Sequence, residues 1–208
     1  MTLLVVTAVE AEAQAVRAGA RGVTVAAVGV GAAAAAAGTA RLLALAEAAG
    51  NPYSAVVAAG IGGGFAGRAP VGATVLATRS IAADLGADSP DGFIPLDDLG
   101  FGTAIAPADP SLLAHLRTAL PDAIAGDILT VNTVTGTAET TETLARRFPA
   151  AVAEAMEGYG AARAATDAGL PFAELRAISN TIGPRDRAAW RIPDALAALT
   201  KAANALAT

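Results

Sequence analysis

The chain has 208 residues, of which 54% are hydrophobic and 16% are charged, and its net charge at pH 7 is −5. This length suits one domain with a sizeable core, and the negative charge argues against a surface that binds nucleic acid phosphates. There is no cysteine, which excludes disulfides and thiolate metal sites, and His115 is the only histidine. We therefore expect neither a metal nor a cofactor.

The N-terminal region and the apolar runs do not predict a membrane protein. Mean hydropathy is +0.50, yet no stretch joins about 20 apolar residues to the flanks that a spanning helix needs. The first residues lack a basic segment, and Glu10 and Glu12 interrupt their apolar run, so we expect no signal peptide. These features predict a cytoplasmic protein that does not enter a membrane.

Apolar runs alternate with helix-forming runs along the chain. Apolar and β-branched runs predict strands at residues 3–8, 23–30, 55–59, 75–83, 127–134, 150–152 and 172–179. Strong helix formers predict helices at residues 10–17, 32–49, 109–120, 137–148, 160–168 and 193–207. Asp109 is the expected cap of its helix, and residues 84–107 are expected to form a loop. The alternation predicts a three-layer α/β/α sandwich with a central mixed sheet.

A glycine run at residues 60–65, G-I-G-G-G-F, follows the third predicted strand. Glycines such as Gly62 and Gly63 let backbone N–H groups approach a ligand closely, so the run predicts a ligand-binding loop. The ligand could be a phosphate, or a sugar with its attacking water. The run lacks the lysine of a phosphate-binding P-loop, and the dinucleotide-binding fingerprint also fails. The alternative is a tight turn in a glycine-rich chain.

Glu12 lies just beyond the first predicted strand. Open α/β sheets bind ligands beyond the carboxyl ends of their strands, and a carboxylate there can accept a proton from water. The alternative is an acid in the first helical turn that the helix dipole stabilises, and this reading fits Glu10 equally well. The residues alone leave both readings open.

A side-chain carboxylate and a side-chain amide point to a nucleoside. Glu157 stands in a small apolar run after Met156, and Asn180 directly follows the last predicted strand. A carboxylate accepts hydrogen bonds from sugar hydroxyls, and an amide can donate to O6 or N7 of a 6-oxopurine while accepting from N1–H. The amino group of adenine would suit a carboxylic acid better. The alternative for Asn180 is a turn-capping residue before Gly183.

Two further segments have an open interpretation. The run V-N-T-V-T-G-T at residues 131–137 could flank a planar base with Val134, Thr135 and Gly136, or could be an ordinary threonine-rich strand end. Residues 185–191 carry the only tryptophan and several arginines. They could form a solvated turn with one apolar plug, or a lid whose arginines meet a substrate carboxylate.

Four motifs in this order resemble the nucleoside phosphorylase and nucleosidase superfamily: T-A-V-E-A-E-A, G-I-G-G-G-F, A-E-A-M-E-G-Y-G and L-R-A-I-S-N. The closer resemblance is to the futalosine hydrolase family, which is similar to the methylthioadenosine/S-adenosylhomocysteine nucleosidases. The run P-R-D-R-A-A-W-R-I adds to it. The resemblance covers nearly the whole chain and implies a nucleoside phosphorylase-like fold, with residues 1–208 forming a single nucleosidase domain.

The resemblance implies that the N-glycosidic bond is cleaved through an oxocarbenium-like ribosyl centre. Glu12 matches the family's water-activating carboxylate, and Glu157 matches the glutamate that holds the ribose hydroxyls. Met156 is expected beneath the sugar, and Arg176 matches an arginine close to the water. Asn180 matches the purine-contacting position, where the adenine-cleaving nucleosidases carry aspartate, so the resemblance implies hypoxanthine as the base.

The implied reaction is hydrolysis of futalosine to hypoxanthine and dehypoxanthinylfutalosine, a step of menaquinone biosynthesis. In it, Val134 and Thr135 match the base-flanking loop. The alternatives are a methylthioadenosine/S-adenosylhomocysteine-type nucleosidase, a purine nucleoside phosphorylase, and a nucleoside-binding protein without activity. Phosphorolysis needs well-placed arginines for a dianion, and none in the N-terminal half is obviously paired in a ligand loop. The family commonly forms homo-oligomers, and residues 93–101 are the candidate contact.

Overall fold

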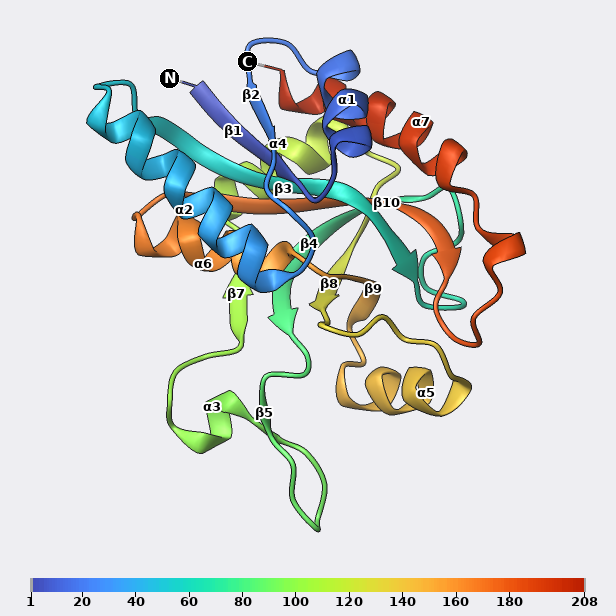
Figure 1. Ribbon diagram of the computed structural model, residues 1–208. Coiled ribbons are helices and arrows are strands. Elements are labelled where there is room, and N and C mark those ends of the chain that lie inside the picture. The colour runs from blue at the N-terminus through green and yellow to red at the C-terminus, as the bar shows by residue number, and fades with distance from the viewer. Residues whose placement is uncertain (1, 208) are drawn as a thin grey trace.

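The computed structural model in Figure 1 describes residues 2–207, which are built around one mixed sheet of eight strands. The strand order is β10-β4-β8-β9-β3-β1-β2, and β7 pairs with β4. The strands are β1 (Thr2–Thr7), β2 (Thr24–Ala27), β3 (Tyr53–Gly64), β4 (Thr74–Ala82), β7 (Ile105–Pro107), β8 (Ile124–Thr130), β9 (Ala151–Ala155) and β10 (Phe172–Thr181). Parallel and antiparallel pairs both occur, which confirms the predicted mixed sheet.

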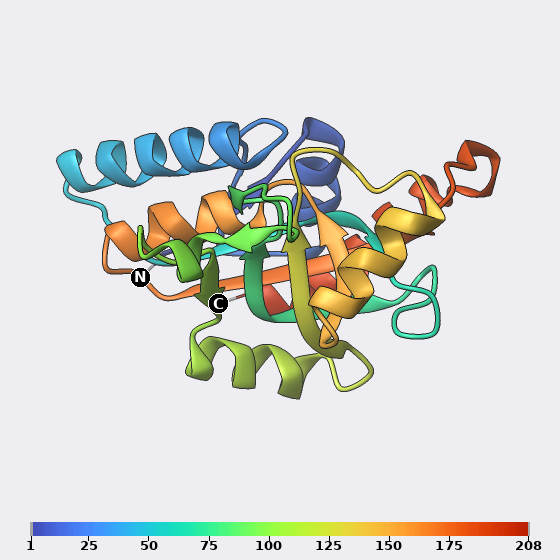
Figure 2. The same ribbon diagram turned by 90° about the horizontal axis from the view of Figure 1, so that it is seen from below.

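Helices cover both faces of this sheet. The helices are α1 (Glu10–Gly19), α2 (Ala32–Ala48), α3 (Leu96–Leu99), α4 (Pro110–Ala119), α5 (Ala138–Arg147), α6 (Gly158–Asp167) and α7 (Ile192–Ala203). One core cluster joins the sheet to α1, α4 and α7 through residues such as Val16, Leu116 and Leu199. A second cluster joins the opposite face to α2 and α6, which lie side by side in Figures 1 and 2. The three-layer α/β/α sandwich predicted from the sequence is therefore confirmed.

Strand β3 is long enough to take part in three pairings. It pairs in parallel with β1 and β10, and at Gly63 and Gly64 it pairs antiparallel with β9. Because β10 also pairs with β4, the strands β3, β10, β4, β8 and β9 close into a small barrel. The wall of this barrel positions the candidate site described below.

The prediction of a loop at residues 60–65 was wrong, because residues up to Gly64 belong to β3. A Cβ atom on Gly64 would lie 2.1 Å from the carbonyl oxygen of Ala69, and one on Gly62 would lie 2.8 Å from that of Glu154. The glycines therefore let neighbouring backbone approach the strand closely, and the N–H groups of this run serve partly in sheet pairing.

Local sequence signals explain other boundaries. Asp109 caps α4 as predicted, since its carboxylate accepts a hydrogen bond of 2.8 Å from the N–H of Leu112. The strand predicted at residues 127–134 is displaced, because β8 ends at Thr130 and residues 131–137 form an irregular segment ahead of α5. Residues 84–107, expected to be a loop, contain the short pair β5 (Gly86–Ala87) and β6 (Ile94–Pro95) as well as α3 and β7.

Between residues 2 and 207, no helix combines the length and apolarity needed to cross a lipid bilayer.

Candidate active site

A cavity of about 270 Å³ opens beside the ends of β1, β3, β9 and β10. Most of the predicted site residues line it, namely Glu12, Gly62, Gly63, Val134, Thr135, Met156, Glu157 and Asn180. Arg176 lies behind this lining and is bonded to Glu157, whereas Gly136 is not among the lining residues. Segments far apart in the sequence thus meet at one end of the barrel, as a sheet of this kind provides.

Glu12 is buried, and main-chain N–H groups hold both of its carboxylate oxygens. Its Oε2 accepts hydrogen bonds from Ala8 (2.9 Å) and Val9 (3.2 Å), in the turn that leads from β1 into α1. Its Oε1 accepts a hydrogen bond of 2.9 Å from Ile61 of β3. Two adjacent strands therefore fix the carboxylate at the cavity wall.

Glu157 stands at the start of α6 and is 7% exposed. Its Oε2 accepts a hydrogen bond from Nη1 of Arg176 (3.1 Å) and one from the N–H of Met156 (3.3 Å). Its Oε1 accepts a hydrogen bond of 3.3 Å from Gly31, whose φ of +92° favours glycine. Carboxylate oxygens have further lone pairs, so Glu157 can still accept hydrogen bonds from a bound sugar.

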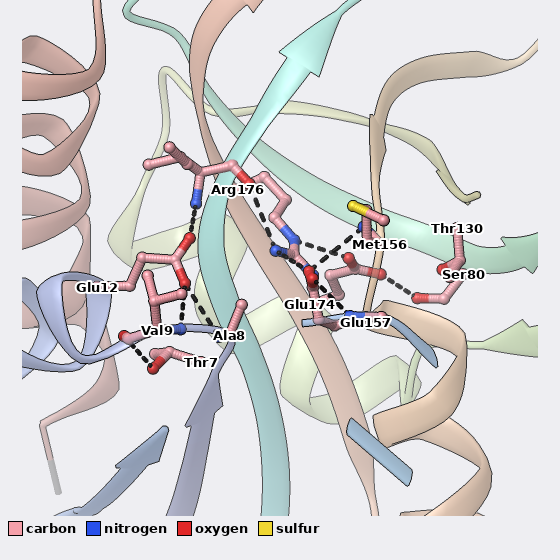
Figure 3. Close-up of polar contacts among 12 residues, drawn as sticks. Thr7, Ala8, Val9, Glu12, Ser80, Thr130, Met156, Glu157, Glu174 and Arg176 are labelled. Atoms are coloured by element: carbon pink, nitrogen blue, oxygen red, sulfur yellow. Dashed lines mark hydrogen bonds and ion pairs between the residues drawn. The ribbon is translucent and has the colours of Figure 1, made fainter. Parts of the chain in front are cut away.

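Arg176 connects the two carboxylates that the sequence predicted. It is 1% exposed and lies between Glu12 on one side and Glu157 and Glu174 on the other (Figure 3). Burial alone would lower its pKa, but the three negative charges outweigh burial and raise the pKa of Arg176 above its ordinary value. A Cβ atom on Gly60 would lie within 2.8 Å of both Glu12 and Arg176, so only glycine leaves room for the two side chains here.

Glu174 is a buried carboxylate that the sequence analysis missed. It accepts a hydrogen bond of 2.9 Å from Nε of Arg176 and another from the hydroxyl of Ser80 on β4. Burial raises its pKa, although Arg176 and Ser80 oppose this effect. A Cβ atom on Gly158 would lie 2.1 Å from a carboxylate oxygen of Glu174, so the glycine that follows Glu157 makes room for this residue. A glutamate in an apolar strand could have signalled a buried ion pair.

Asn180 lies near the end of β10 with its amide partly engaged. Its Oδ1 accepts a hydrogen bond of 2.8 Å from the hydroxyl of Ser179, and its Nδ2 donates one of 3.1 Å to the carbonyl of Thr181. An amide has two N–H donors and two acceptor lone pairs. One donor and one acceptor of Asn180 therefore remain for a ligand in the cavity.

Glu154 on β9 lines the cavity together with Glu12 and Glu157, and the sequence analysis did not single it out. Its two oxygens accept hydrogen bonds from the N–H (2.8 Å) and the hydroxyl (2.5 Å) of Thr135. These contacts tie the irregular segment after β8 to the cavity. Burial raises the pKa of Glu154, and the two hydrogen bonds from Thr135 only partly offset this shift.

The charged segment at residues 185–191 reaches the cavity with two of its side chains. Arg185 and Trp190 are lining residues, whereas Arg187 is not. His115 is exposed on α4 and does not line the cavity. Residues 2–207 hold no group of three or more histidine, aspartate or glutamate side chains placed to bind a metal ion.

Comparisons with known proteins assign this architecture to a family. The model of the phosphorylase superfamily matches residues 7–208. A futalosine hydrolase of Streptomyces coelicolor is 56% identical over 158 residues, which make up 76% of this chain and 67% of the relative. The chain belongs to the futalosine hydrolase family of the phosphorylase superfamily. A futalosine hydrolase of Acidothermus cellulolyticus is 52% identical over 74% of this chain and 64% of its own length, so the chain spans about two thirds of these relatives.

Solved structures of low sequence identity share the fold. A methylthioadenosine/S-adenosylhomocysteine nucleosidase of Colwellia psychrerythraea in complex with adenine has a TM-score of 0.82 at 21% identity, covering 99% of this chain and 94% of that chain. A futalosine hydrolase of Helicobacter pylori has a TM-score of 0.81 at 18% identity, and the match covers 99% of this chain and 97% of that chain. The nucleoside phosphorylase-like fold that the motifs implied is confirmed.

The raised pKa of Glu154 predicts a pH-dependent difference in stability. A carboxyl group with a raised folded-state pKa contributes fully below its ordinary value of 4.5, and this contribution is lost as pH rises through the raised pKa. We therefore expect Glu154→Gln to gain stability relative to the parent chain between pH 4.5 and pH 8. Urea unfolding at both pH values measures this change.

The matched control is Glu47→Gln, which removes an exposed carboxylate on α2. The difference in unfolding free energy between this variant and the parent chain should be nearly the same at the two pH values. An equal response of the Glu154 and Glu47 variants would contradict the effect of burial.

Proposed function

We propose that this chain hydrolyses the N-glycosidic bond of futalosine and releases hypoxanthine and dehypoxanthinylfutalosine. The observation that carries the proposal is a cavity that joins the buried carboxylates of Glu12 and Glu157 to the amide of Asn180. The 56% identity to a futalosine hydrolase supports the choice of substrate.

In the proposed reaction, Glu12 activates the attacking water. The carboxylate accepts a proton from water as the water oxygen bonds to the anomeric carbon, and the bond electrons leave with the base. The hypoxanthine then takes up a proton from solvent at nitrogen, and Glu12 returns its proton to solvent, so one water is consumed and the products balance. The backbone donors of Ala8, Val9 and Ile61 hold the carboxylate in place without a side-chain rearrangement.

Glu157 has the role of binding the ribose and stabilising its charge. Its oxygens face the cavity beside Met156 and can accept hydrogen bonds from the 2′ and 3′ hydroxyls. Three carboxylates, those of Glu12, Glu157 and Glu174, surround the one guanidinium of Arg176, so negative charge is in excess at the cavity wall. This excess favours a ribosyl centre that becomes positive in the transition state.

Asn180 recognises the departing base. Its free amide hydrogen can donate to O6 or N7 of hypoxanthine, and its free lone pair can accept from N1–H. An amide stabilises the developing charge on the base without delivering a full proton. Val134 and Thr135 line the same cavity and would flank the base.

Water suits this cavity better than phosphate. Among the lining residues within the described part of the chain, Arg185 is the only cation, and it lies in the exposed segment after β10. Arg176 is already bonded to Glu157 and Glu174. A phosphate dianion beside Glu12 would lack the arginines that usually bind such a group.

Release of the free base tests this proposal. We expect phosphate-independent release of hypoxanthine from futalosine, measured by chromatography with and without phosphate. Glu12→Gln should lower kcat by about 10²- to 10⁴-fold, the usual range for losing a general base. Glu157→Gln should also abolish most activity, because the ribose loses a charged partner. Inosine and methylthioadenosine are the competing substrates.

The control for these variants is Glu10→Gln, which removes an exposed carboxylate of the same helix that pairs with Arg17. It should retain the parent activity. Full activity of Glu12→Gln, or a strict requirement for phosphate, would rule out a hydrolysis in which Glu12 activates the water.

Asn180 gives a separate test of base recognition. An aspartic acid at this position can donate a proton to N7 and accept from the amino group of adenine. We therefore expect Asn180→Asp to raise the ratio of adenine release to hypoxanthine release by at least about tenfold, the effect of one mismatched polar contact. Parallel assays with methylthioadenosine and futalosine measure this ratio.

The control is Asn51→Asp, which adds the same charge in the turn between α2 and β3, far from Asn180 in the sequence. It should leave the ratio of adenine release to hypoxanthine release unchanged. An identical ratio for the Asn180 variant would refute the assignment of its amide to the base.

We also propose that the chain forms a homo-oligomer through residues 93–101. Phe101 is 81% exposed in this segment, and burying it against a second copy would remove apolar surface from water. Light scattering should report a dimer or larger assembly, and Phe101→Ser should weaken it. A parent chain that stays monomeric at high concentration would contradict the proposal.

A further inference from the structure

The segment between β10 and α7 brings Trp190 and Arg185 to the edge of the cavity, with Arg187 close to the same ring. It contains a short 3₁₀ turn at Arg187–Ala189, and Trp190 follows this turn. The guanidinium carbon of Arg185 lies 5.3 Å from the centre of the Trp190 ring, and that of Arg187 lies 5.7 Å from it. A hydrogen bond of 2.8 Å from the N–H of Arg191 to Ser179 anchors the segment to β10.

These two arginines have no carboxylate partner of their own. No ion pair within residues 2–207 involves Arg185 or Arg187. Asp186 lies between them in the sequence, but its carboxylate accepts the N–H of Ala188 at 3.1 Å and caps the 3₁₀ turn. Each guanidinium therefore keeps its hydrogen-bond donors available to a ligand.

The position of Arg185 determines which part of a ligand it can meet. The buried wall of the cavity carries Glu12 and Glu157, which the proposed function assigns to water and ribose. The lining residues that are exposed to solvent include Val9, Val30 and Arg185, and they mark its mouth. A substrate longer than a simple nucleoside has to extend past this mouth.

We propose that Arg185 and Trp190 form a subsite for the carboxylate-bearing aromatic end of the substrate. The inference rests on the proposed function, because futalosine carries such a group in addition to its hypoxanthine and ribose. Arg185 pairs with the carboxylate, and the aromatic ring packs against the indole of Trp190. Arg187 adds a second positive charge close to the same ring.

The chemistry of both partners fits this assignment. Guanidinium groups bind carboxylates through paired, charge-assisted hydrogen bonds, and aromatic rings favour offset or edge-to-face contact. The chain as a whole carries a charge of −5, so a cation at the cavity mouth also offsets repulsion of an anionic substrate. Simple nucleosides lack the group that this subsite would bind, so the subsite selects for the longer substrate.

The decisive experiment compares futalosine with its methyl ester, which keeps the aromatic ring and removes the charge. In the parent chain, kcat/KM for the acid should exceed that for the ester by about ten- to hundredfold, the range for a charged hydrogen bond. In Arg185→Ala this ratio should fall close to one, chiefly through KM. Hypoxanthine release from inosine should be the same for both chains.

Matched variants separate charge from packing. Arg146→Ala removes an exposed arginine of α5 that lies outside the cavity lining, and it should keep the parent ratio. Trp190→Ala should lower kcat/KM for the acid and the ester alike, and Trp190→Phe should restore part of the loss. An unchanged acid-to-ester ratio in Arg185→Ala would overturn the subsite.

A binding readout keeps this inference distinct from the proposed reaction. Trp190 is the only tryptophan, so its fluorescence reports directly on the subsite. Futalosine should change the emission of the Glu12→Gln variant more strongly than its ester does at equal concentration, and adding Arg185→Ala should abolish this difference. Failure of turnover with intact charge-dependent binding would reject the reaction alone. Turnover of futalosine without charge-dependent binding would reject the subsite alone.

Discussion

A single buried guanidinium lies among three carboxylates in the interior of this molecule. Arg176 bonds to Glu174 and Glu157 and lies close to Glu12, and all four side chains are buried. A buried ion pair stabilises a fold only when its hydrogen bonds are complete, because desolvation otherwise exceeds the attraction between the charges. The fold must therefore place Arg176 and its carboxylate partners next to one another. Residues 174 and 176 meet this need within one strand, because alternate positions of a strand share one face.

Closure of the barrel makes this arrangement possible. Strand β3 runs between β1 and β10, and its backbone meets both reactive regions: the N–H of Ile61 bonds to Glu12, and its carbonyl oxygen accepts from Arg176 at 3.4 Å. On the other side of the cavity, Glu154 of β9 fixes the segment that follows β8 through Thr135. The position of each carboxylate thus depends both on strand pairing and on the turns and segments that follow the strands.

Much of this could be predicted from sequence, because the relevant signals were local. Alternating apolar and helix-forming runs predicted the layers, and Asp109 marked a helix start. The motifs predicted that Glu12, Glu157 and Asn180 lie in one cavity. The role of Glu174 was not predicted, because its hydroxyl partner, Ser80, is 94 residues away in the chain. No local pattern encodes a contact of that separation.

The prediction of a loop at the glycine run was wrong for a related reason: its residue types favour a turn, and only pairing with β10 and β9 makes it part of the sheet. That run also leads to a broader consequence. One wall of the cavity consists of β3 backbone, where glycines leave no side chain to exchange and close contacts oppose adding one. Next to it, Asn180 of β10 and the exposed segment that follows it contribute side chains to the lining. Relatives of this chain can therefore diverge in which nucleoside they accept while the bond-breaking apparatus stays the same.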